Sequence, residues 1–320
     1  MSNLIRYFLV VRSRWESWAD RHVFAPHWTN ASAAVRLSLS MACLLVFTTW
    51  IGDLPVWTAA DGPLSREVTG FLIGDGLANS GADFRISPLY YTDRHLWTAG
   101  YVLIGVIASL IAMSGLGGRW SAAFLCIWVL GLIHRIAPIQ TNGEILVSTF
   151  LPYLVIDQGW LAHPSRVGFS DDQRRWTVRL MLTLMRCHLA IWVAVTLAFH
   201  LSQNMWWDGS AGSTIASRLE KSLDQPNGLT SQHVLSTVWA NIWLLIQIAA
   251  IAVLCLPRAA IAATAVLGCY WFCGWLWSGD WLYALAGLAV SSFLYFDASL
   301  EWGALKRGGA TGGPGALSTH

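Results

Sequence analysis

The sequence predicts an all-α protein, a polytopic transmembrane bundle of about eight helices. Only 12% of its 320 residues are charged and 55% are hydrophobic, whereas soluble domains carry about 25% charged residues. The chain also contains 20 tryptophans, whose indole rings collect at the membrane–water interface. A net charge of +2, with no basic cluster beside interleaved aromatics, excludes a nucleic-acid partner. The remaining class is an integral membrane protein whose first partner is the lipid bilayer.

Apolar runs of about 17–25 residues mark the candidate spans. They cover 33–51, 96–115, 120–133, 145–160, 178–199, 238–256, 259–277 and 281–296. The third and fourth runs are short, and Pro138 and Pro152 predict broken or tilted helices there. Residues 1–32 then form an interfacial amphipathic segment, 33–297 the membrane domain and 298–320 a disordered, Gly-rich tail.

The distribution of Arg and Lys predicts the orientation, because cytoplasmic loops carry the excess. With a cytoplasmic N-terminus, the inner segments hold Arg6, Arg12, Arg14, Arg21, Arg119, Arg166, Arg174, Arg175, Arg179, Arg258, Lys306 and Arg307. The outer segments hold only Arg66, Arg85, Arg94, Arg135, Arg218 and Lys221. We therefore expect a bacterial inner-membrane protein with both termini in the cytoplasm. The six cysteines form no C-x-x-C pair and no zinc-ligand spacing, so no metal site is predicted.

Polar residues gather in two segments that this topology places on the outer side. One segment, H-R-I-A-P-I-Q-T-N-G-E, joins the third and fourth spans, and the other, H-L-S-Q-N-M-W-W-D-G-S-A, follows the fifth. A site at this membrane boundary suits a lipophilic molecule that meets polar groups. Its candidate residues are His134, Arg135, Asn142, Glu144, His200, Trp206 and Asp208. The alternative is that these are ordinary loop residues, with Trp206 and Trp207 as interfacial anchors.

Ionisable residues inside the spans are functional candidates by default, because each costs about 2.5–3.5 kcal/mol to insert. Arg36 lies near the inner end of the first span, from where we expect it to reach the interface. Arg186 and His188 lie deeper, in the fifth span. Arg186 is a candidate substrate contact, and hydrogen bonding between helices is the alternative for both residues.

These segments resemble the horizontally transferred transmembrane (HTTM) family. The family includes the membrane domain of vitamin K-dependent gamma-carboxylase and the bacterial protein that matures the sporulation-delaying toxin. The resemblance runs from about residue 28 to 296. It rests on A-A-V-R-L-S-L-S around Arg36, on R-I-A-P-I-Q-T-N-G-E with Glu144 in the acidic place, on F-S-D-D at 169–172, and on L-M-R-C-H-L-A-I-W-V followed by W-W-D-G-S-A.

The departures from the family pattern matter as much as the matches. The carboxylase uses a membrane-edge lysine as its base, and His200 occupies that place here. The only lysines are Lys221 and Lys306, and neither can substitute. The resemblance therefore argues against vitamin K-dependent carboxylation, although it leaves room for a quinone-type lipophilic cofactor. Histidine has an ordinary pKa of about 6.5, which suits proton transfer.

Three functions follow from these observations. In the first, the chain is an enzyme or maturation factor that acts on a lipophilic molecule or an exported peptide. His200, Glu144 and His134 are then the catalytic candidates, and the substrate contacts are Arg135, Asn142, Trp206, Asp208 and Arg186. In the second, it is a structural subunit that binds a neighbouring membrane protein, and His200 only caps the fifth helix. In the third, it transports a small molecule, although the second half has no broken helix to match Pro152.

Overall fold

The computed structural model describes residues 29–59, 61–65, 67–68, 87–91, 94–136, 139–156, 171–207, 210–211, 233–256 and 260–294. Its regular elements are all helices and no strand occurs among these residues, which confirms the all-α class. The N-terminal amphipathic segment up to residue 28, the Gly-rich tail, Pro138 and Asp208 lie outside the described residues.

Five helices are long and apolar enough to cross a membrane: α2 (Thr29–Trp57), α4 (His95–Ser114), α8 (Asp171–Leu201), α11 (His233–Cys255) and α12 (Ala260–Ser278). Each coincides with one of the apolar runs of the sequence. These helices are compatible with an integral membrane protein. A helix that crosses a hydrocarbon core of about 30 Å satisfies all its backbone hydrogen bonds internally, so long apolar runs fold in this way.

The other three predicted spans are helical but shorter. α5 (Gly118–Arg135) has 18 residues, which corresponds to about 27 Å. The fourth run is divided into α6 (Asn142–Phe150) and α7 (Tyr153–Ile156). The division falls at Pro152, as predicted, because proline has no N–H to continue the ladder. The last helix, Trp281–Leu294, is also short. A count of about eight spans therefore stays a prediction.

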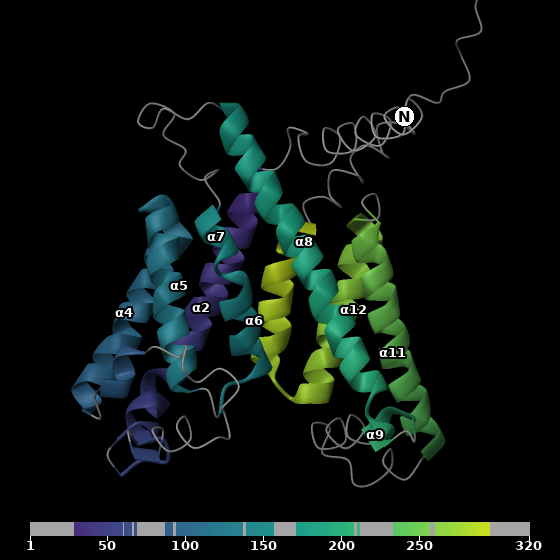
Figure 1. The fold of residues 1–320 in the computed structure, drawn as a ribbon, viewed down its shortest axis with the longest axis horizontal. Helices are drawn as coiled ribbons and strands as arrows, with labels where there is room; N and C mark the ends of the chain where they lie inside the picture. Colours follow the sequence, from purple (N-terminus) through teal and green to yellow (C-terminus); the bar gives the residue numbers. More distant parts are fainter. Residues whose placement is uncertain are drawn as a thin grey trace, which may run out of the picture.

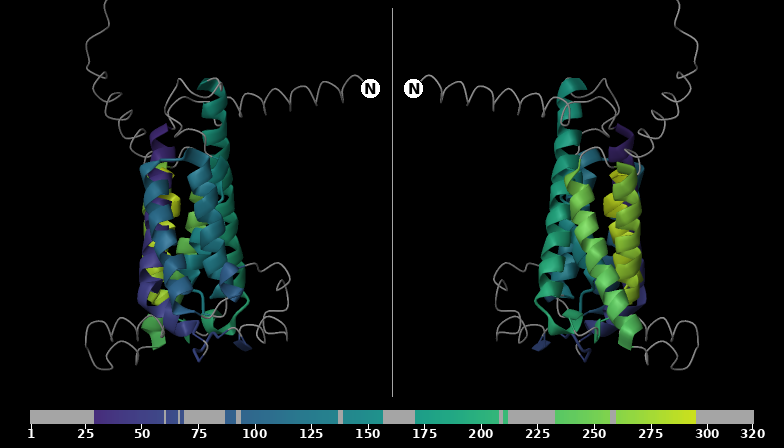
Figure 2. Two further views of the ribbon diagram at one scale, coloured as in Figure 1. Left: turned by 90° about the vertical axis from the view of Figure 1, so that its left-hand side faces the viewer. Right: turned by 90° about the vertical axis from the view of Figure 1, so that its right-hand side faces the viewer.

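The helices lie side by side along one direction (Figure 1). α4 and α5 occupy one flank of the bundle, α11 and α12 occupy the other, and α8 crosses between them. α8 has 31 residues, so it is about 46 Å long and projects beyond the bundle at the end where it begins (Figure 2). The most extensive helix pairs are α2 with α4, α8 with α11, and α11 with α12.

Small residues let the helices approach closely, as is common in membranes. A Cβ atom at Gly105 of α4 would lie 2.3 Å from the Phe47 ring of α2. A Cβ atom at Gly287 of the last helix would lie 2.1 Å from the Trp271 ring of α12. Large rings therefore pack directly on glycine backbones in two of the interhelical contacts.

Arg36 is enclosed by the protein at the end of the bundle where α5 begins. Its side chain is buried, with 1% exposed, and Nη1 donates to the carbonyl oxygen of Gly118 at 3.0 Å. The turn between α4 and α5 lies beside this part of α2 and offers an acceptor inside the protein. That Arg36 reaches the membrane interface stays a prediction. Arg36 therefore ties α2 to the start of α5.

Candidate functional site

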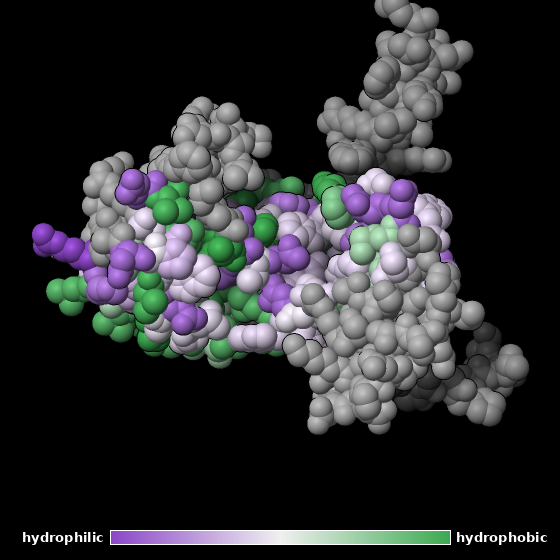
Figure 3. All heavy atoms as spheres, turned by 90° about the horizontal axis from the view of Figure 1, so that it is seen from below, coloured by the Kyte–Doolittle hydropathy of each residue, from purple (hydrophilic) through white to green (hydrophobic). Residues whose placement is uncertain are grey.

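The two polar segments of the sequence lie at the same end of the bundle. α5 ends, α6 begins and α8 ends at the lower end in Figure 1, which we call the rim. α9 (Asn204–Trp207) follows α8 there. Seen from the rim, hydrophilic residues are scattered among apolar ones (Figure 3). The chain direction alone brings these segments to one end, because α5 and α8 run the same way.

His200 lies in the last turn of α8 and its ring is enclosed by aromatic side chains. Only 6% of the residue is exposed. The ring centroids of Trp206, Trp243 and Trp277 lie 4.2, 6.2 and 6.5 Å from that of His200. We call these four residues together with Gln247 the His200 cluster. The cluster joins α8, α9, α11 and α12 at the rim.

Two donors converge on one nitrogen of His200. Trp243 Nε1 lies 3.3 Å from Nδ1. Of the Gln247 amide, Nε2 lies 2.8 Å from the same atom and Oε1 lies 3.3 Å from it, so the nitrogen is the nearer group. An indole N–H can only donate, so Nδ1 must accept and carries no proton. The proton of the neutral ring therefore resides on Nε2. Among the described residues, none makes a hydrogen bond to Nε2.

The bonds of His200 argue against a capping role for its side chain. The imidazole bonds to two residues of α11, and a helix cap would bond to the carbonyls of α8 itself. The Leu201 carbonyl at the end of α8 accepts instead from Trp207 Nε1 at 2.9 Å. Trp207 is exposed, whereas Trp206 is buried against His200. The two adjacent tryptophans thus have different roles.

Glu144 is buried at the start of α6, where it completes a capping box. Its Oε2 accepts from the backbone N–H of Thr141 at 2.7 Å, and the Thr141 hydroxyl accepts from the Glu144 N–H at 3.4 Å. Its Oε1 accepts from Trp50 Nε1 at 2.5 Å. Both carboxylate oxygens therefore stabilise the helix start and its contact with α2.

Asp280 caps two helices at once. Its Oδ1 accepts from the N–H of Tyr283, in the first turn of the last helix, at 3.1 Å. Its Oδ2 accepts from the N–H of Gly143, in the first turn of α6, at 3.0 Å. A carboxylate is favourable at a helix N-terminus, and here it faces two such termini. We call Thr141, Gly143, Glu144 and Asp280 the capping junction.

One short turn connects the capping junction to the His200 cluster. Trp277 packs on Trp206 with ring centroids 4.8 Å apart, and Asp280 follows three residues later. Gly279 between them has a φ of 69°, which is a conformation that favours glycine. The turn between α12 and the last helix therefore brings the two polar segments into one rim assembly.

No protein-family model matches the chain. No curated protein and no solved structure matches it either. Its function is therefore argued from the rim itself.

His134 and Arg135 lie at the end of α5 and hold neighbouring loops. The His134 carbonyl accepts from the Tyr90 hydroxyl at 2.6 Å; Tyr90 belongs to the 3₁₀ helix η2 (Pro88–Tyr91). Arg135 is fully buried, its Nη2 donates to the Leu64 carbonyl at 2.7 Å, and its guanidinium lies 5.9 Å from the Tyr90 ring. Arg135 thus anchors the segment that follows α2.

Arg186 lies at the opposite end of the bundle from the rim. Its Nε donates to the Leu254 carbonyl at 2.7 Å, and its Nη2 to the Val253 and Leu256 carbonyls at 3.2 and 2.6 Å. These carbonyls end α11, where a cation is favourable. Arg186 is therefore separated from His200 by about 21 Å of α8 and cannot share a site with it. His188 likewise bonds another helix, with Nδ1 2.9 Å from the Tyr153 hydroxyl.

The remaining sequence candidates add little geometry. Asn142 is exposed at the first residue of α6, and Asp208 lies outside the described residues. A small groove, lined in part by Trp239, Trp243 and Cys273, borders the His200 cluster. Within the described part of the chain, no group of three or more His, Cys, Asp or Glu residues is placed to hold a metal ion.

Four residues of the rim were not predicted from the sequence: Gln247, Trp243, Trp277 and Asp280. Gln247 carried a usable signal, because an amide in the middle of an apolar run needs a partner inside the bilayer. Asp280 also carried one, since it directly precedes a helix in the S-G-D turn. The tryptophans carried none, because the chain has many of them and most suit the interface equally well.

Proposed function

We propose that this chain is an HTTM-like integral membrane protein of a bacterial inner membrane, an enzyme or maturation factor that acts at the rim on a lipophilic molecule or an exported peptide. The distribution of Arg and Lys supports a rim that faces away from the cytoplasm. The five long apolar helices are observed in the structure and do not depend on this proposal.

The observation that carries the proposal is the geometry of His200. A single nitrogen, Nδ1, receives both donors from α11, so the imidazole is oriented and its Nε2–H is directed elsewhere. A fixed imidazole of this kind can donate a hydrogen bond or transfer a proton. Trp206, whose ring centroid lies 4.2 Å from that of His200, makes the surroundings of the imidazole apolar.

The other two catalytic candidates fit a supporting role. Both oxygens of Glu144 are engaged by Thr141 and Trp50, so this carboxylate fixes the helix start beside the site. The backbone carbonyl of His134, at the end of α5, accepts from the Tyr90 hydroxyl. We therefore assign the chemistry to His200. Glu144 and Arg135 hold the helix start and the loop of the rim in place.

The test compares His200→Gln with the wild type in cells that express the full chain. Lipid extracts and secreted peptides are compared by mass spectrometry, and a product of the protein appears as a molecule present only with the wild type. Because general acid–base groups contribute about 10²–10⁴-fold to rate, we expect the variant to reduce that molecule at least about 100-fold. His95→Gln is the control, since His95 is exposed at the start of α4.

Equal product levels from His200→Gln and the wild type, at equal membrane expression, would refute the enzyme proposal. The second candidate, a structural subunit that binds a neighbouring membrane protein, is favoured by the fact that Glu144, Arg135 and Arg186 all serve helix ends or loops. It predicts a partner that co-purifies with the chain and still does so with His200→Gln.

A further inference from the structure

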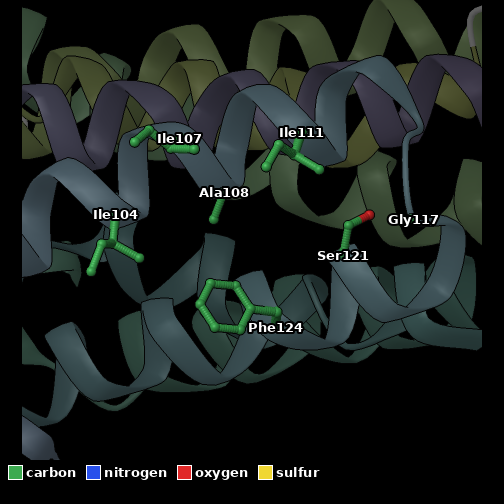
Figure 4. A pocket seen from close by; sticks show the side chains of 7 residues that line it. All are labelled: Ile104, Ile107, Ala108, Ile111, Gly117, Ser121 and Phe124. Carbon is green, nitrogen blue, oxygen red and sulfur yellow. The ribbon is translucent and has the colours of Figure 1, made fainter.

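A groove of about 340 Å³ runs along the outside of the bundle between α4 and α5 (Figure 4). Ile104, Ile107 and Ile111 of α4 line one side, and Phe124 of α5 lines the other. Gly117 and Ser121 lie at one end. The lining is apolar apart from this end. Its volume falls in the range of about 300–1,000 Å³ that holds small ligands.

The groove covers one half of the length of α4. Ile104 is in the middle of the 20-residue helix α4, and Gly117 precedes α5 at the helix turn. The groove therefore extends over about 15 Å, half of a hydrocarbon core of about 30 Å. α4 packs on α2 and α5, and the isoleucines of the groove are more than 40% exposed. In a membrane such a surface meets lipid tails.

The end of the groove at the turn is positively charged. Arg119 is exposed two residues after Gly117, and its guanidinium lies 5.3 Å from the ring centroid of Trp120. Trp120 is 72% exposed, which is typical of an indole at the interface. Arg36 donates to the Gly118 carbonyl from the inside. Residues 95–143 contain no Asp or Glu, so this end attracts an anion.

We propose that the groove binds an anionic phospholipid, with one acyl chain between α4 and α5 and its phosphate at Arg119. The apolar groove and the cationic turn follow one another as the acyl chain and the headgroup of a lipid do. Basic sites between transmembrane helices on the cytoplasmic side bind anionic headgroups in this way, and the Arg and Lys distribution assigns this turn to that side. The proposal is independent of the chemistry at His200.

The test is native mass spectrometry of the full chain in detergent, with phosphatidylglycerol or phosphatidylcholine of identical acyl chains added at equal concentration. We expect the wild type to retain more phosphatidylglycerol. Arg119→Gln should lower that occupancy about fivefold and leave phosphatidylcholine unchanged. The control Arg94→Gln, which alters an exposed arginine at the opposite end of α4, should retain the preference.

A second variant tests the apolar part of the groove. Ser121→Phe places a ring in the groove and should lower the retention of both lipids, whereas Leu103→Phe, on the exposed face of α4 beside it, should not. Monodisperse elution of each variant shows that it is folded. Equal retention of both lipids by the wild type would overturn the proposal. So would a dimer that Ser121→Phe dissociates, because a second copy would then occupy the groove.

Discussion

Replacing Gly143 by alanine tests the capping junction. A Cβ atom at this position would lie 2.6 Å from the backbone nitrogen of Tyr283 and 2.7 Å from the carbonyl carbon of Leu282. Both are backbone atoms in the first turn of the last helix, so neither can rotate away. The starts of α6 and of the last helix must therefore separate, and the bond from the Gly143 N–H to Asp280 lengthens or breaks.

The expected decrease in the free energy of unfolding of Gly143→Ala has two parts. Overpacking against rigid surroundings costs about 1–3 kcal/mol, and a lost hydrogen bond to a charged group costs about 1.5–3 kcal/mol. The two costs do not simply add, because separating the helices relieves the overpacking but breaks the hydrogen bond. The total is therefore about 2–4 kcal/mol. The matched control is Gly100→Ala in α4, where nothing lies within 4 Å of the added Cβ. There alanine should be neutral or stabilise by up to about 1 kcal/mol.

The assay is unfolding of the purified protein in mixed micelles by increasing sodium dodecyl sulfate, followed by tryptophan fluorescence. A double-mutant cycle with Asp280→Ala measures the coupling between Gly143 and Asp280. In the wild type, Asp280→Ala removes caps from two helices and should cost about 1 kcal/mol for each. In the Gly143→Ala background the bond from the Gly143 N–H to Asp280 is already lost, so the same change should cost about half as much. The reasoning is refuted if Gly143→Ala is as stable as Gly100→Ala, or if the two costs simply add.

Three further outcomes are expected. In protein labelled with ¹⁵N-histidine, His200 should give the resonances of the neutral ring protonated at Nε2, and a ring protonated at Nδ1 would contradict the hydrogen bonds drawn from α11. Arg186→Gln should lower the free energy of unfolding by about 1–3 kcal/mol, because the last carbonyls of α11 lose their donor; unchanged stability would show that water replaces it. In a variant whose native cysteines are replaced, cysteines at the exposed positions Asn142 and Ser202 should react with an impermeant maleimide from outside intact cells, and one at Ser114 should not; the reverse labelling pattern would invert the assigned orientation.

The sequence predicted the helices well because their cause is local. An apolar run of sufficient length satisfies its own backbone only as a helix, so the boundaries of α4, α11 and α12 follow closely from composition. Pro152 divides the fourth run for an equally local reason, the missing N–H. That the two polar segments lie at the same end of the bundle could be predicted as well, because successive spans alternate in direction. These features need no knowledge of which helix packs on which.

Only the tertiary structure decided the roles of the polar residues. His200 was visible in the sequence, but its partner Gln247 lies 47 residues away, and the height and rotation of two helices determine whether they meet. For the same reason Asp280 serves two helix starts, Glu144 has both oxygens engaged, and Arg186 lies at the far end. An apolar run specifies that a helix forms, but side-chain packing against its neighbours sets the direction in which each polar group points, and that packing is not local.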